Sequence, residues 1–99
     1  MTPEHCRDTA ASLLRRAGFD EPVQPHPGAS RYLKGRGVPF KIRVSTHRRR
    51  NTSRFRYADV KVSIVFERPH TQGEVELRVS RAIELFEERV TQTVEGEPA

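Results

Sequence analysis

Two runs of alternating residues constrain the fold of this chain more than any other feature. They cover residues 40–45 (FKIRVS) and 60–66 (VKVSIVF), and apolar and polar side chains alternate in both. A period of two is typical of a β-strand with one buried face and one solvent-exposed face. The apolar positions are Phe40, Ile42, Val44, Val60, Val62, Ile64 and Phe66, and the basic positions Lys41, Arg43 and Lys61 fall on the opposite face. We therefore expect an antiparallel hairpin with one apolar and one basic face.

The segment between the two runs is rich in arginine. Residues 48–57 have the sequence RRRNTSRFRY, which contains five arginines and almost nothing that can build a core. A hairpin would place this segment at its tip, where it would be longer than the usual two to five residues. Since crowded like charges repel each other, the folded protein alone gains nothing from them. The pattern favours a binding role for the loop.

Two amphipathic helices are expected to flank the strands. The first covers residues 3–17: Thr2 is a good N-cap, Pro3 suits the first turn, and Gly18 ends the helix. Its apolar stripe is Cys6, Ala10, Leu13, Leu14 and Ala17, which makes Cys6 a small core residue.

The second helix is expected over residues 74–90. Thr71 and Glu74 have the spacing of a capping box, and Val75, Val79, Ala82, Ile83, Phe86 and Val90 form one stripe. Residues 75, 77 and 79 also alternate, so a strand over residues 74–79 stays open as an alternative.

The remaining segments complete an α+β fold. Residues 31–34 suit a short strand, and residues 35–37 (GRG) suit a turn after it. The proline-rich residues 21–28 are expected to form a loop, with a short edge strand near Val23 as the alternative. The predicted order is αβββα: a three-stranded antiparallel sheet with both helices on one face, in two layers. One domain spans residues 1–99, ordered over about 3–90 and ending in a flexible tail, 91–99.

Positive charge is concentrated on the strands and the segment between them. Of a net charge of +5, residues 31–70 alone contribute twelve Lys and Arg against two acidic residues, whereas the flanking segments are net acidic. Such concentration is typical of a surface that binds a polyanion.

The candidate binding residues are basic or aromatic. Arginine and lysine neutralise phosphates, and aromatic side chains stack on bases; an alternative for Phe55 or Tyr57 is that it anchors the loop to the core. The set is Arg31, Lys41, Arg43, His47, Arg48, Arg49, Arg50, Arg54, Phe55, Arg56, Tyr57 and Lys61. The expected partner is a nucleic acid or a nucleic-acid-handling protein complex.

Catalytic and metal chemistry find little support in the sequence. The histidines and Cys6 have no metal-ligand spacing, so no metal or cofactor is expected, and one cysteine allows no internal disulfide. Ser45 and His47 share a strand face, but without a third orienting group they are interpreted as two polar residues rather than as a catalytic pair. The chain is therefore expected not to be an enzyme. Without a membrane-spanning run or signal-peptide pattern, it is expected to be cytoplasmic, with no membrane partner.

Residues 13–19 (LLRRAGF), followed by residues 28–32 (GASRY), resemble the opening of the HicA family of small toxins. The resemblance implies a double-stranded-RNA-binding-like fold and cleavage of messenger RNA. The family's histidine after Gly-Ser is missing, and Arg31 stands near that position. Residues 30–32 and 42–47 are also similar to a pattern in small uncharacterised proteins of phages and mobile elements, and small phage proteins include inhibitors of bacterial immunity such as anti-CRISPR proteins.

Three functional hypotheses result. The first is a non-catalytic basic module of phage or mobile-element type that binds nucleic acid or a nucleoprotein complex through an arginine-rich hairpin. The second is an anti-CRISPR-like inhibitor that binds a host immune effector protein, and the third is a HicA-like endoribonuclease. RNA, DNA and a protein surface all stay open as partners, and the sequence does not set the oligomeric state.

Overall fold

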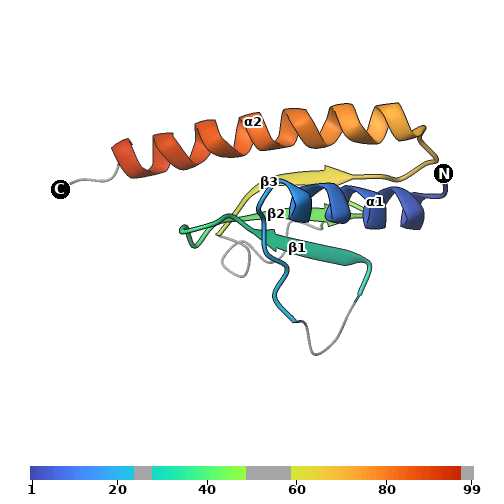
Figure 1. Ribbon diagram of the computed structural model, residues 1–99, viewed down its shortest axis with the longest axis horizontal. Helices are drawn as coiled ribbons and strands as arrows, with labels where there is room; N and C mark the ends of the chain where they lie inside the picture. Colours follow the sequence, from blue (N-terminus) through green and yellow to red (C-terminus); the bar gives the residue numbers. More distant parts are fainter. Residues whose placement is uncertain (24–27, 49–58, 97–99) are drawn as a thin grey trace.

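A computed structural model of the chain describes residues 1–23, 28–48 and 59–96. The elements are α1 (Pro3–Arg16), β1 (Ser30–Lys34), β2 (Lys41–Ser45), β3 (Val60–Val65) and α2 (Gln72–Gly96) (Figure 1). The predicted order of helix, three strands and helix is confirmed, and so is the α+β class.

The sheet is mixed rather than antiparallel. Its strand order is β1-β2-β3, in which β1 and β2 pair antiparallel through a turn where Gly37 has a φ of 73°. Strands β2 and β3 pair parallel, so the predicted antiparallel hairpin is wrong. The physical reason is the length of residues 46–59, because parallel strands need a crossover of about a dozen residues or more. The arginine-rich segment therefore does not sit at a hairpin tip: it leaves one end of the sheet and rejoins it at the other.

One face of the sheet forms the core together with both helices (Figure 1). Helix α1 packs on β1 and β2, helix α2 packs on β3, and the helices also contact each other. The buried strand residues are Leu33, Ile42, Val44, Val62 and Ile64, followed by Phe66 just after β3. The predicted burial of Ile42, Val44, Val62 and Ile64 is confirmed. We call the opposite side of the sheet, away from the helices, the open face.

Helix α1 begins and ends as its sequence indicates. The hydroxyl of Thr2 accepts a hydrogen bond from the backbone N–H of His5 at 3.1 Å, and Gly18 has a φ of 102°. Phe19 then turns back into the core and packs edge-to-face on Phe86 of α2, with ring centroids 5.1 Å apart. The predicted stripe is correct except at its end, where Ala17 is exposed and Ala11 is buried instead.

Helix α2 begins with the predicted capping box. The N–H of Thr71 donates to the Glu74 carboxylate at 2.9 Å, and the N–H of Glu74 donates to the Thr71 hydroxyl at 3.2 Å. Residues 74–79 are therefore helical, and the alternative of a strand there is wrong. The helix continues past the predicted end at Val90 to Gly96, because no helix-breaking residue intervenes. Residues 97–99 of the predicted tail lie outside the described part.

The edge of β1 is extended by one bridge. The backbone groups of Asp20 and Lys34 exchange two hydrogen bonds, of 2.9 and 2.6 Å. Residues 21–23 form no strand, and Val23 is fully exposed, so the alternative of an edge strand gains no support from these residues. Residues 24–27 lie outside the described part.

Replacing Ile64 with alanine should destabilise the fold by about 2–5 kcal/mol, since the change removes buried methyl groups from a core that only one sheet face supplies. Urea denaturation followed by circular dichroism measures the loss. Ser63→Ala on the exposed side of the same strand is the matched control and should change the free energy of unfolding by less than about 0.5 kcal/mol. Equal stabilities for the two variants would contradict the assignment of the buried face.

Candidate nucleic-acid interface

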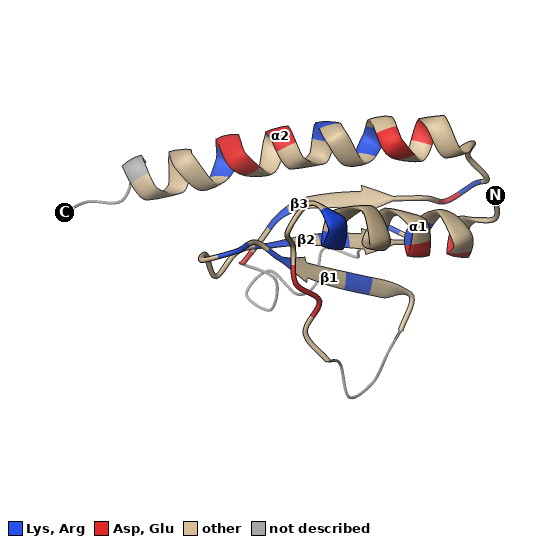
Figure 2. Ribbon diagram, viewed as in Figure 1, with Lys and Arg blue, Asp and Glu red and all other residues tan. Residues whose placement is uncertain are grey.

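The three strands carry basic residues and no acidic ones. Their five Lys and Arg residues are Arg31 and Lys34 in β1, Lys41 and Arg43 in β2, and Lys61 in β3. Both helices, by contrast, mix the two signs of charge (Figure 2). The sheet is thus the basic layer of the described part.

Three lysines gather at one end of the sheet. Lys34 and Lys41 are directly opposite each other in the antiparallel register, and Lys61 follows Val60, the parallel partner of Lys41. Lys34 and Lys41 alternate with core residues and therefore belong to the open face, and Lys61 lies beside them where the register of β2 and β3 shifts. We call Lys34, Lys41 and Lys61 the lysine row. Lys34 was absent from the sequence-based site, although the short turn before Lys41 could have indicated its position.

The lysine row is only partly neutralised. Lys41 forms a salt bridge with Asp59 at 2.9 Å, and the ammonium of Lys61 lies 4.5 Å from the centroid of the Phe40 ring. In the described part of the chain, neither Lys34 nor Lys61 has a carboxylate within salt-bridge distance. Lys41 and Lys61 are half-buried rather than fully exposed as predicted.

The burial of Arg43 contradicts the prediction that the basic side chains of β2 are exposed. Only 2% of this residue is accessible, although it alternates with core residues on the central strand. Its Nη2 donates to the backbone carbonyl of His47 at 3.0 Å, and its buried Nε has no hydrogen-bond partner among the described residues. Arg43 therefore orders the chain at the end of β2 and does not present its charge to solvent.

Ser45 and His47 form part of the same polar cluster. The Ser45 hydroxyl lies 3.0 Å from the hydroxyl of Ser30 and 3.4 Å from Nδ1 of His47, and it also accepts the N–H of His47 at 3.3 Å. Ser45 is completely buried, and no carboxylate among the described residues contacts His47. A buried hydroxyl beside an unsupported imidazole is a poor nucleophile, and the cluster is better explained as a structural end to β2.

Arg31 is engaged in an ion-pair network on the helix side of the sheet. Its guanidinium binds Glu21 through two parallel hydrogen bonds, and Nη1 contacts the Asp8 carboxylate at 3.2 Å. The bonds to Glu21, followed by those to Asp8, raise the pKa of Arg31. Burial opposes ionisation of Asp8, but the hydrogen bonds and charges of Arg7 and Arg31 outweigh it and lower the pKa of the carboxyl. Arg31 therefore joins α1 to β1 and lies apart from the lysine row.

Arg48 marks the other end of the sheet. It is largely exposed after β2, where its Nε donates to Glu67 at 2.9 Å. The other predicted binding residues, Arg49, Arg50, Arg54, Phe55, Arg56 and Tyr57, lie outside the described part of the chain. Within residues 1–23, 28–48 and 59–96, no group of His, Cys, Asp and Glu side chains could hold a metal ion, and no helix is long and apolar enough to cross a membrane.

Comparison with known proteins gives no match: no family model, curated protein or solved structure is similar to this chain. The resemblances to HicA toxins and to small mobile-element proteins therefore stay hypotheses. The case for a function depends on the geometry and charge of the chain itself.

The network around Asp8 predicts a small pH-dependent stability. Because the pKa of Asp8 is lowered in the folded state, its contribution is present above the ordinary pKa of aspartate and is lost as pH falls through the lowered value. Asp8→Asn should cost less than about 1 kcal/mol at pH 7, since the carboxylate is half exposed, and less than that at pH 3. Urea denaturation at both pH values tests this, with Asp20→Asn as a control that removes an exposed carboxylate. If Asp8→Asn lowers the free energy of unfolding equally at both pH values, the ionised carboxylate of Asp8 is not what stabilises the fold.

Proposed function

We propose that this protein is a non-catalytic module that binds nucleic acid through the lysine row at one end of its sheet and the basic segment that joins β2 to β3. The single observation that carries the proposal is the lysine row. The register of three strands brings three lysines to one end of the sheet, where Asp59 is the one carboxylate that pairs with any of them in the described part of the chain.

This arrangement works against the stability of the isolated protein. Like charges directly opposite each other on a sheet are destabilising, and Lys34 faces Lys41 in this way. A bound polyanion would turn that repulsion into attraction, because each phosphate contacted by a lysine also releases condensed counterions. The lysine–lysine repulsion that destabilises the free protein would therefore be offset by attraction to phosphates in the complex.

The connection between the strands is itself strongly basic in sequence. It starts at Arg48 beside one end of the sheet and rejoins at Asp59, whose carbonyl accepts the N–H of Lys41 at 2.9 Å. Residues 49–58 between these points contain four arginines and no acidic residue. The chain thus tethers a strongly basic segment at both ends of the basic sheet, which suits a ligand with many phosphates in a row.

The binding test uses two variants with the same change in net charge. Lys34→Ala/Lys61→Ala removes two lysines of the row, and Arg16→Ala/Arg81→Ala removes two exposed helix arginines that form no salt bridge in the described part. Fluorescence anisotropy with labelled RNA and DNA oligonucleotides should show at least about a tenfold loss for the first variant and much less for the second. The melting temperature should be the same or slightly higher in the lysine variant, because a repulsion is removed.

Salt dependence and product analysis separate the alternatives. The slope of log affinity against log salt should fall by roughly 0.7–0.9 for each phosphate that the lysine variant no longer neutralises. Equal reductions in affinity for both variants would contradict the lysine row as the site. An absence of oligonucleotide binding would sink the proposal and favour a protein partner, as expected of an immune inhibitor, and shortening of the RNA would favour a ribonuclease.

A further inference from the structure

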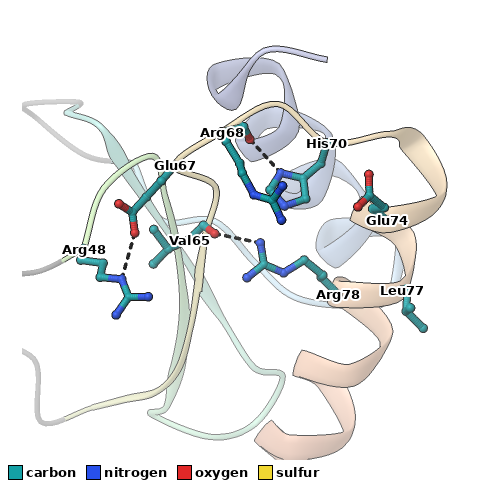
Figure 3. A pocket seen from close by; sticks show the side chains of 8 residues that line it. All are labelled: Arg48, Val65, Glu67, Arg68, His70, Glu74, Leu77 and Arg78. Carbon is teal, nitrogen blue, oxygen red and sulfur yellow. Dashed lines mark hydrogen bonds and ion pairs between the residues drawn. The ribbon is translucent and has the colours of Figure 1, made fainter.

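A cavity lies at the end of the sheet opposite the lysine row. It has a volume of about 450 Å³ and is formed where the ends of β2 and β3 meet the first turns of α2 (Figure 3). Its size falls within the roughly 300–1,000 Å³ of ligand pockets, which is room for one small organic unit and not for a duplex. Nothing in the strand or helix pattern of the sequence indicated this cavity, because its wall is assembled from distant segments.

Two arginines of the cavity wall form no salt bridge within the described residues. Arg78 is fixed: its Nη1 donates to the carbonyl of Val65 at 2.8 Å, and its guanidinium stacks 5.1 Å from the centroid of the Phe66 ring. Arg68 is exposed and forms no hydrogen bond or salt bridge through its guanidinium within the described residues. Figure 3 shows both guanidinium groups directed into the cavity.

The carboxylates in the wall are already engaged. Glu67 holds Arg48 at 2.9 Å, and Glu74 accepts the N–H of Thr71 at 2.9 Å as part of the helix cap. These hydrogen bonds from Thr71 lower the pKa of Glu74, with smaller contributions from His70 and Arg68, so the cap stays ionised at neutral pH. Glu67 and Arg48 offset each other, so the positive charges of Arg68 and Arg78 exceed the single negative charge that Glu74 leaves in the cavity.

Apolar surface borders the two cations. Leu77, which directly precedes Arg78 on the outside of α2, is 55% exposed, and Val65 at the end of β3 is half-buried. A pair of guanidinium groups beside an apolar wall matches the two halves of a nucleotide, which has an anionic phosphate and a flat base with hydrophobic faces.

We propose that this cavity binds one nucleotide of a single-stranded nucleic acid, with its phosphate between Arg68 and Arg78 and its base against Leu77 and Val65. The inference rests on the proposed function and specifies the form of the ligand. A duplex keeps its bases stacked inside and cannot offer one to this wall, whereas a single strand can. Strand β3 has six residues and so spans about 20 Å, so a strand of several nucleotides reaches both the lysine row and the cavity.

The first experiment compares two arginine variants that differ in their relation to the cavity. Arg68→Ala removes a cavity arginine without breaking a bond in the described structure, and Arg81→Ala removes an exposed arginine of α2 that does not line the cavity. Anisotropy is measured with one labelled oligonucleotide, single-stranded and annealed to its complement. The wild type should prefer the single strand. Arg68→Ala should reduce the affinity for the single strand by about tenfold and change the affinity for the duplex little. Arg81→Ala should change neither affinity much. Equal single-strand and duplex affinities, or equal effects of the two variants, would overturn the inference.

The second experiment does not depend on oligonucleotide binding. Adenosine monophosphate at millimolar concentration is added to the full chain, and the methyl resonances of Val65 and Leu77 are followed by NMR. We expect both to shift in the wild type and in Arg81→Ala, and to shift much less in Arg68→Ala. Silent methyl groups would overturn the cavity site even if oligonucleotides bind through the lysine row. Shifting methyl groups without oligonucleotide binding would instead retain the cavity and reject the proposed function.

Discussion

The parallel pairing of β2 and β3 is the constraint on which both candidate surfaces depend. It places the starts of the two strands together, which brings Lys61 beside Lys41 and hence beside Lys34. It also places their ends together, which lets Arg48 reach Glu67 and leaves room for the cavity before α2. In an antiparallel pair, Lys41 and Lys61 would lie at opposite ends of the sheet, and so would Arg48 and Glu67. One topological choice therefore divides the basic charge between two ends of the sheet.

The distribution of carboxylates reinforces this division. On the helix side, Asp8 and Glu21 neutralise Arg31 and make it part of the packing between α1 and β1. Within residues 31–70 the two acidic residues, Asp59 and Glu67, each hold one neighbouring cation. Among the described cations that form no salt bridge, Lys34 and Lys61 lie at one end of the sheet and Arg68 and Arg78 at the other. Local ion pairs hold the fold together, while the uncompensated charges stay available for a ligand.

The periodicity of the sequence predicted the features that depend on local sequence. It did not predict the direction in which the strands pair. The helices, their caps and the buried faces of β2 and β3 follow from spacing and composition. The direction of β3 does not, because reversing a strand leaves a period of two unchanged; the only signal was the length of residues 46–59, which also suits a long hairpin loop. Burial of Arg43 was also missed, because alternation shows which face a residue occupies and not whether the centre of that face is accessible. The cavity arginines could not be predicted, since Arg68 and Arg78 are brought together with Arg48 only by the fold.

The outer edge of β3 is closed by side chains of α2. Arg78 donates to the carbonyl of Val65 near one end of this edge strand, and Arg89 donates to the carbonyl of Lys61 near the other. Unpaired strand edges recruit strands from other molecules and are a common origin of aggregation. A foreign strand would have to displace two guanidinium groups before it could join this sheet, and it would approach a charged rim as it did so. The arginines that make the protein basic thus also keep its sheet at three strands.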